Sequence, residues 1–135
     1  MKVVCVQIRP EFKNKRKSIE RAESILDEIS GEVDLIVLPE MALVGYRFED
    51  RADIAPHMES VPTDLDTLLN SLDDAEEASE PCSFKWAFKV SKRFSPAWVA
   101  VGFAEKDSED RYFNSALVVN HELRICHVVR KVLLF

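Results

Sequence analysis

The sequence has few of the features that mark membrane, secreted or nucleic-acid-binding proteins. Its 135 residues include no apolar run near the ~20 residues of a membrane-spanning helix, and the first apolar segment, residues 3–8, is too short for a signal-peptide core. Acidic side chains outnumber basic ones by 24 to 18, and no Lys and Arg cluster is interleaved with aromatics. We expect no membrane anchor, no nucleic-acid partner, and a cytoplasmic or nuclear location.

Cysteine is also scarce, and its spacing suits neither cross-links nor metal. Cys5, Cys82 and Cys126 are an odd number, and no CxxC pair or neighbouring pair of histidines accompanies them. The sequence therefore predicts neither a disulfide framework nor a zinc site, and no cofactor is implied. What it does have is a 47% share of hydrophobic residues, which at this length allows one folded domain with a core.

The N-terminal third predicts a strand–helix–strand unit. Residues 2–8 are Val-rich and apolar on both faces, as in a strand that is covered on two sides. A helix over about 14–29, capped by Asn14, is expected because apolar side chains recur at three- and four-residue steps. A second apolar strand follows at 34–38. The two strands should lie parallel, because a helical crossover joins them.

Glu40 comes directly after the second of these strands. Pro39 stops that strand, so the carboxylate lies at its C-terminal end. In open α/β sheets, ligands usually bind at this edge. On position alone, a capping or loop role would still be the commoner one.

The rest of the chain predicts an acidic segment, a helix and three more strands. Residues 60–81 are polar and acidic, and we interpret them as a short surface helix followed by a solvated loop. A helix is expected over 83–94, and strands are expected over 97–104, 112–120 and 123–129. The last strands should extend the sheet in antiparallel fashion, giving a mixed sheet in an α/β fold.

Two blocks of sequence resemble one known family. Residues 34–48, DLIVLPEMALVGYRF, resemble the glutamate motif of the nitrilase superfamily of carbon–nitrogen hydrolases. Residues 99–120, VAVGFAEKDSEDRYFNSALVVN, and 128–135, VVRKVLLF, are similar to the family's Gly-Glu strand, YNSA strand and lysine motif, in the same order. Two ordered blocks make a chance match improbable.

The resemblance implies a chemistry and assigns two residues to it. In this family a glutamate is the general base, a lysine stabilises the oxyanion, and a cysteine attacks the carbon of an amide or nitrile. By resemblance, Glu40 is the base and Lys131 is the oxyanion partner. Asn114 matches the Asn of the YNSA strand and is expected to hold the strand edge.

Residues 45–60, GYRFEDRADIAPHMES, are similar to the N-terminal amidases within this superfamily. Those enzymes deamidate N-terminal Asn and Gln of proteins. The resemblance therefore implies an amide substrate, with protein N-terminal Asn or Gln as the specific expectation.

The chain departs from the family pattern in three ways. Val129 stands where the family has a Tyr before Arg-Lys, and Val132 stands where it has Ser, Thr or His, so the oxyanion corner has lost polar groups. The nucleophilic cysteine of the family lies a few dozen residues beyond the lysine motif. We therefore expect the nucleophile outside residues 1–135 and no turnover by this chain alone.

None of the three cysteines present is expected to replace it. Cys126 is five residues before Lys131, an odd separation that points the two side chains to opposite faces of a strand. Cys5 falls in mid-strand and is expected to be a buried small hydrophobe. Cys82 lies near the acidic segment and is interpreted as incidental.

The resemblance also implies a fold, the four-layer α-β-β-α sandwich, of which residues 1–135 would supply the first half with an acidic insertion at about 60–81. Helices on one face of the sheet would leave the other face bare and apolar, so we expect self-association or a complementary half. Three hypotheses remain: an amidohydrolase completed outside this chain, a non-catalytic binding or assembly module, or a small α/β ligand-binding domain.

Overall fold

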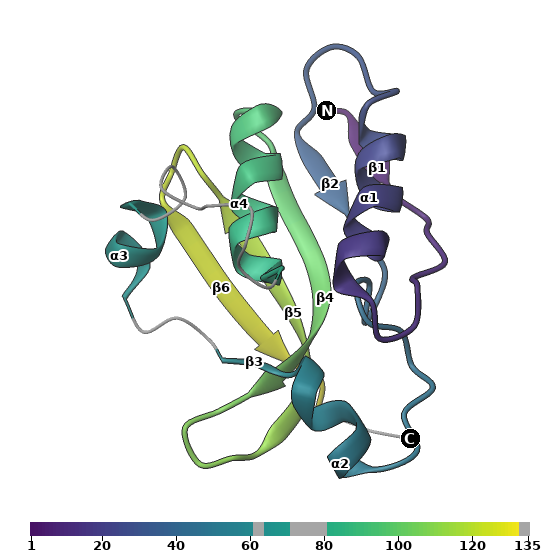
Figure 1. Ribbon diagram of the computed structural model, residues 1–135. Coiled ribbons are helices and arrows are strands. Elements are labelled where there is room, and N and C mark those ends of the chain that lie inside the picture. Colours follow the sequence, from purple (N-terminus) through teal and green to yellow (C-terminus); the bar gives the residue numbers. More distant parts are fainter. Residues whose placement is uncertain (61–63, 71–80, 133–135) are drawn as a thin grey trace.

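The computed structural model describes residues 1–60, 64–70 and 81–132 and contains one mixed sheet with its two longest helices packed on one face (Figure 1). The strands are β1 (Val3–Cys5), β2 (Leu35–Val37), β3 (Glu59–Ser60), β4 (Trp98–Lys106), β5 (Tyr112–Asn120) and β6 (Ile125–Arg130). The helices are α1 (Lys15–Leu26), α2 (Arg51–Ile54), the 3-10 turn η1 (Ala55–His57), α3 (Leu65–Asn70) and α4 (Ser83–Arg93). The strands run in the order β1-β2-β4-β5-β6, and β3 pairs with β4.

The predicted strand–helix–strand unit is confirmed. β1 and β2 are parallel, with Val4 opposite Ile36, and β2 is parallel to β4, with Ile36 opposite Val99. The Asn14 side chain caps α1 by accepting from the Lys17 amide at 3.0 Å. β1 is shorter than the predicted strand, although the Val6 amide still donates to the Val37 carbonyl at 2.8 Å.

The second half of the sheet is antiparallel, as the sequence predicts. β4 pairs with β5, with Gly102 opposite Ala116, and β5 pairs with β6, with Ser115 opposite Arg130. β5 has the predicted bounds, and β4 and β6 differ from the predicted strands by one or two residues at their ends. In the acidic segment α3 is present, while residues 71–80 lie outside the described residues.

The short elements between residues 51 and 60 were not predicted from the sequence. α2, η1 and β3 form there. β3 pairs with β4 through only two residue pairs, which is too short for an alternating hydrophobic pattern to predict a strand. Glu59 in β3 accepts hydrogen bonds from the Ser83 amide at 2.8 Å and the Ser83 hydroxyl at 2.7 Å, and it pairs with Lys15 at 2.7 Å. This carboxylate therefore joins β3, α1 and the start of α4.

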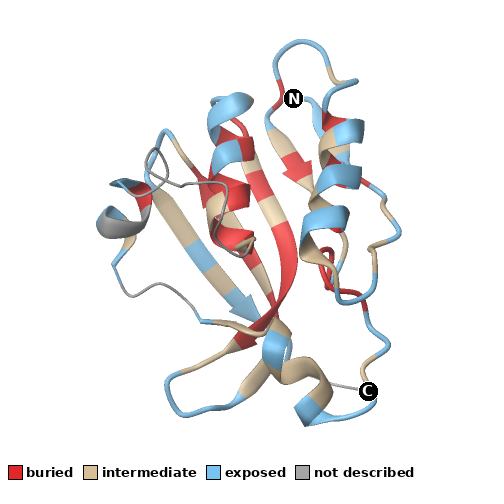
Figure 2. Cartoon of the chain, in the orientation of Figure 1, coloured by how far each residue is buried: buried red, intermediate tan, exposed pale blue. Residues whose placement is uncertain are grey.

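The core lies between the sheet and the helices α1 and α4 (Figure 2). Along β4 the side chains alternate, so that Val99, Val101 and Phe103 are buried against the helices. Phe84 of α4 packs edge-on against Phe103, with ring centroids 5.1 Å apart. Because side chains alternate along a strand, the residues between these buried positions point to the opposite face of the sheet.

The opposite face of the sheet carries apolar side chains that the described helices do not cover. Val3 is 43% exposed and Val129 60% exposed, and Val37 and Ala100 between them are half-buried. We call this surface the open face. The expectation that Cys5 is buried is wrong, because this residue is exposed on β1. In the described part of the chain no helix is long and apolar enough to cross a membrane.

Candidate active site

The backbone after β2 carries Glu40 onto the open face. The Leu38 amide donates to the Ala100 carbonyl at 2.8 Å, which continues the pairing with β4. Met41 then adopts a left-handed backbone conformation with φ of 50°, and the Ala42 amide donates to the Gly102 carbonyl at 3.1 Å. The tight turn of residues 39–42 is thus bonded to β4 at two points, and it holds Glu40 above that strand.

Gly102 is the residue that lets this turn approach. A Cβ at position 102 would lie 2.6 Å from Cα of Glu40, 2.7 Å from the Met41 nitrogen and 2.8 Å from the Pro39 carbonyl oxygen. All three are backbone atoms, which cannot rotate away as a side chain could. The position of Glu40 therefore requires glycine at 102.

The structure brings Glu40 and Lys131 together although 91 residues separate them. Nζ of Lys131 lies 2.9 Å from Oε1 of Glu40. The Asn114 side-chain amide also donates to Oε1 of Glu40, and the Asn114 carbonyl accepts from the Lys131 amide at 2.9 Å. Asn114 thus does more than hold the strand edge, because it contacts both Glu40 and Lys131.

Tyr46 is a further partner of Glu40. Burial, together with the interaction with the Glu40 carboxylate, raises the pKa of Tyr46 to about 12. The phenol therefore stays protonated, and it can donate to Glu40, at any pH near neutrality.

These contacts set the charge state of Glu40. The hydrogen bond from Lys131 is the main cause that lowers the pKa of Glu40 below its ordinary value of 4.5, with Asn114 and Tyr46 acting in the same direction and partial burial opposing them. Glu40 is therefore ionised near pH 7, the state in which a carboxylate can accept a proton.

A cavity of about 350 Å³ lies beside the pair. Its lining is mostly apolar and comes from β2, β4, β5 and β6, including Val37, Ala100, Ala116 and Val129. Its polar lining includes Glu40, Asn114 and Lys131. A small amide could contact a base and a cation here, because the Glu40 and Lys131 side chains are 41% and 42% exposed.

None of the three cysteines lines the cavity beside the Glu40–Lys131 pair. Cys126 is half-buried and packs against the helix-side core, the face opposite Lys131, as its spacing predicts. Cys82 stands at the N-cap of α4, where burial raises the pKa of its thiol. Cys5 is exposed at the end of β1. Among the described residues no group of three or more His, Cys, Asp or Glu side chains could hold a metal ion.

Sequence reasoning reached Glu40 and Lys131 and missed Gly102 and Tyr46. Both lie within the quoted motif blocks, but neither carries a spacing signal of its own. Gly102 could have been found from one fact: it is a glycine inside an otherwise apolar strand, which often marks a close backbone approach.

Comparisons at the level of sequence and of fold relate this chain to one family. Residues 2–135 match the family described as Carbon-nitrogen hydrolase. The chain therefore belongs to the carbon–nitrogen hydrolase family. Its fold matches part of nitrilase-superfamily structures, such as Saccharomyces cerevisiae Nit3, with a TM-score of 0.64 at 18% identity over 98% of this chain and 44% of that one.

Two relatives with similar sequences are protein N-terminal amidases. The Saccharomyces cerevisiae protein N-terminal amidase is 31% identical over 100% of this chain and 27% of its own length, and the Schizosaccharomyces pombe one is 28% identical over 100% of this chain and 44% of its length. A crystal structure of an N-terminal amidase with a Gln-Val peptide superposes with a TM-score of 0.77, at 31% identity over 98% of this chain and 28% of that one. The chain thus spans less than half the length of these relatives.

Gly102→Ala tests the geometry of the site. The added methyl meets backbone, so we expect the turn to shift, the unfolding free energy to fall by about 1–3 kcal/mol, and Glu40 to move away from Lys131. The pKa of Glu40, followed by 13C NMR of its carboxyl carbon, should then rise towards 4.5.

Gly31→Ala is the matched control. It adds the same methyl in a turn where nothing lies within 4 Å, so it costs only backbone strain at a φ of 75° and should leave the Glu40 titration unchanged. A Gly102→Ala protein with the wild-type Glu40 pKa would contradict the account.

Proposed function

We propose that residues 1–135 supply the general base, Glu40, and the oxyanion-stabilising cation, Lys131, of an amide-hydrolysing site. The observation that supports this proposal is the 2.9 Å contact between Lys131 Nζ and Glu40 Oε1 beside a largely apolar cavity. A carboxylate that is ionised near pH 7 and an ammonium with two remaining N–H donors are the groups that such a reaction needs.

In the proposed first step, Glu40 takes the proton of a thiol, and the thiolate attacks the amide carbon. The carbonyl π electrons move to oxygen, and the Lys131 ammonium stabilises the resulting oxyanion. As the carbonyl re-forms, the C–N bond breaks, the proton on Glu40 passes to nitrogen, and ammonia leaves. A water molecule deprotonated by Glu40 then cleaves the thioester, which yields the carboxylic acid and returns the thiol.

The thiol in this scheme is proposed to come from polypeptide other than residues 1–135. Cys126 packs on the helix side of the sheet, Cys82 is the N-cap residue of α4, and Cys5, although exposed, does not line the cavity beside the Glu40–Lys131 pair.

The proposed substrate is an N-terminal Asn or Gln of a peptide or protein. The support is the similarity to protein N-terminal amidases over the whole chain, together with solved amidase structures that hold Gln-Val and Asn-Glu peptides. Tyr46, whose pKa the Glu40 carboxylate helps to raise, lies in the segment whose sequence is similar to those amidases.

The open face supports a covering partner, either a second copy of the chain or a complementary half. Val3 and Val129 expose 43% and 60% of their surface, and Leu35, Trp98 and Val118 are half-buried on the same side. Apolar surface of this kind is costly to leave in water. A non-catalytic assembly module would use the same face. Only a measurement of turnover therefore distinguishes such a module from an amide hydrolase.

Ammonia release from peptides beginning with Asn or Gln tests the catalytic proposal. Residues 1–135 alone should give no turnover, and the chain extended by a cysteine-bearing continuation should be active. In the active protein, Glu40→Gln should lower kcat by roughly 10²–10⁴-fold, because the base is lost. Lys131→Met should lower it by roughly 10²–10³-fold, because the oxyanion loses its cation.

Lys106→Met is the control, since Lys106 pairs with Asp110 at 2.6 Å, away from the site. It should leave kcat near the wild-type value. Thiol-dependent turnover by residues 1–135 alone would overturn the assignment of the nucleophile. Turnover that survives Glu40→Gln would overturn the role of Glu40.

Sedimentation velocity tests the covering partner. The 135-residue chain should self-associate as its concentration rises, and Val129→Lys should shift it towards monomer by placing a charge on the open face. Ile25→Lys is the matched control, because Ile25 is 36% exposed on α1, which packs on the other side of the sheet. A chain that stays monomeric at all concentrations would contradict self-association.

A further inference from the structure

Lys131 occupies a weakly supported place in the fold. It is the first residue after β6, which in the described part of the chain has only β5 as a strand neighbour. The end of an edge strand frays easily, and a lysine side chain is flexible. The proposed chemistry nevertheless needs Nζ of Lys131 to stay within hydrogen-bond reach of Glu40. The bond from the Lys131 amide to the Asn114 carbonyl joins this end of β6 to β5, and a contact that reaches β4 would restrain it further.

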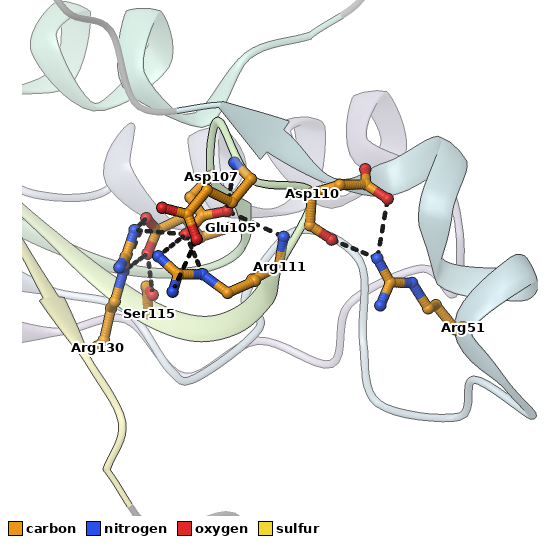
Figure 3. A network of polar contacts seen from close by, with 8 residues as sticks. Arg51, Glu105, Asp107, Asp110, Arg111, Ser115 and Arg130 are labelled. Atoms are coloured by element: carbon orange, nitrogen blue, oxygen red, sulfur yellow. Dashed lines mark hydrogen bonds and ion pairs between the residues drawn. The ribbon is translucent and has the colours of Figure 1, made fainter.

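Arg130, the residue before Lys131, makes such an attachment on the other face of the sheet. Neighbouring strand residues point to opposite faces, so Arg130 lies on the helix side when Lys131 lies on the open face. Its guanidinium binds the Glu105 carboxylate, with Nε 3.0 Å from each oxygen and a terminal nitrogen 2.5 Å from Oε1 (Figure 3). The two planar groups meet through several hydrogen bonds, the strong form of this contact.

Glu105 is a firm anchor for this contact. It is 0% exposed and lies on β4, and its Oε2 accepts from the Ser115 hydroxyl of β5 at 2.6 Å. The Arg130 guanidinium lies over the Phe113 ring, 3.9 Å from the centroid, on its way across β5. Asp107 is a more distant second carboxylate, 3.9 Å from Arg130. Arg130 thus ties the end of β6 to β4 across the strand between them.

One strand therefore locates both members of the proposed catalytic pair. Gly102 of β4 supports the turn that carries Glu40, and Glu105, three residues on, binds the arginine next to Lys131. We propose that the Glu105–Arg130 ion pair positions Lys131 against Glu40. Glu105 and Arg130 are positioning residues in this proposal, which rests on the proposed function.

The reactivity of the Lys131 amine measures its position without any need for turnover. Removing Arg130 alone would leave a buried carboxylate unpaired and could unfold the chain, so the main variant is the double substitution Glu105→Gln with Arg130→Met. In this protein we expect the acetylation rate of Lys131, mapped by mass spectrometry, to rise roughly twofold to fivefold as the amine leaves Glu40. Arg130→Lys should give a smaller rise, because an ammonium keeps the charge but not the planar fork.

Internal and matched controls separate positioning from general support of the fold. Lys15, which pairs with Glu59 and is largely buried, should keep its slow rate in every variant. Arg124→Met breaks the arginine–carboxylate pair with Asp66 at the other end of β6 and should leave Lys131 unchanged.

Two results would overturn the proposal: a wild-type Lys131 rate in the double variant, or a rise at Lys15 equal to that at Lys131, which would make the ion pair a general support of the fold. Neither result bears on the proposed function. That fails separately, if kcat in the active protein is unaffected by Lys131→Met.

Discussion

The close approach of the turn of residues 39–42 to β4 is the constraint on which the site depends. With a side chain at position 102 the turn would have to lift from the sheet, because the missing Cβ would meet three backbone atoms at 2.6–2.8 Å. Because the turn lies flat, Glu40 reaches Asn114 on the next strand and Lys131 beyond it. Residues that are distant in the sequence thereby share one carboxylate oxygen.

The sheet separates two tasks between its faces. On the helix side, the apolar side chains of β4 and β5 and the Glu105–Arg130 ion pair hold the strands together. On the open face, the same strands present Gly102, Asn114 and, just past β6, the Lys131 side chain. The alternation of a strand makes this division possible, since each position serves only one face. The apolar remainder of the open face, which includes Val129, is the surface that we propose a partner covers.

Much of this could be read from the sequence, and the exceptions have physical causes. The strand–helix–strand unit was predictable because its apolar periods are long and Asn14 caps the helix, and Glu40 was placed by Pro39. Lys131 was reached only through resemblance, since nothing in local spacing relates it to Glu40. Gly102, Tyr46 and Glu105 act through contacts between different strands and loops, and such contacts produce no repeating pattern in the sequence. Cys5 was misplaced because the strand was assumed to be covered on both faces.

The titration of Glu40 tests the central claim, that Lys131 and Glu40 form one charge-paired site, most directly. A depressed carboxyl pKa stabilises the fold above the unfolded value near 4.5, and that contribution is lost as the pH falls through the lower folded value. In 13C NMR, Glu40 of the wild-type chain should titrate below 4.5, and in Lys131→Met its pKa should rise, because the hydrogen bond from Lys131 is the largest cause of the shift. Identical Glu40 pKa values in the two proteins would contradict the account.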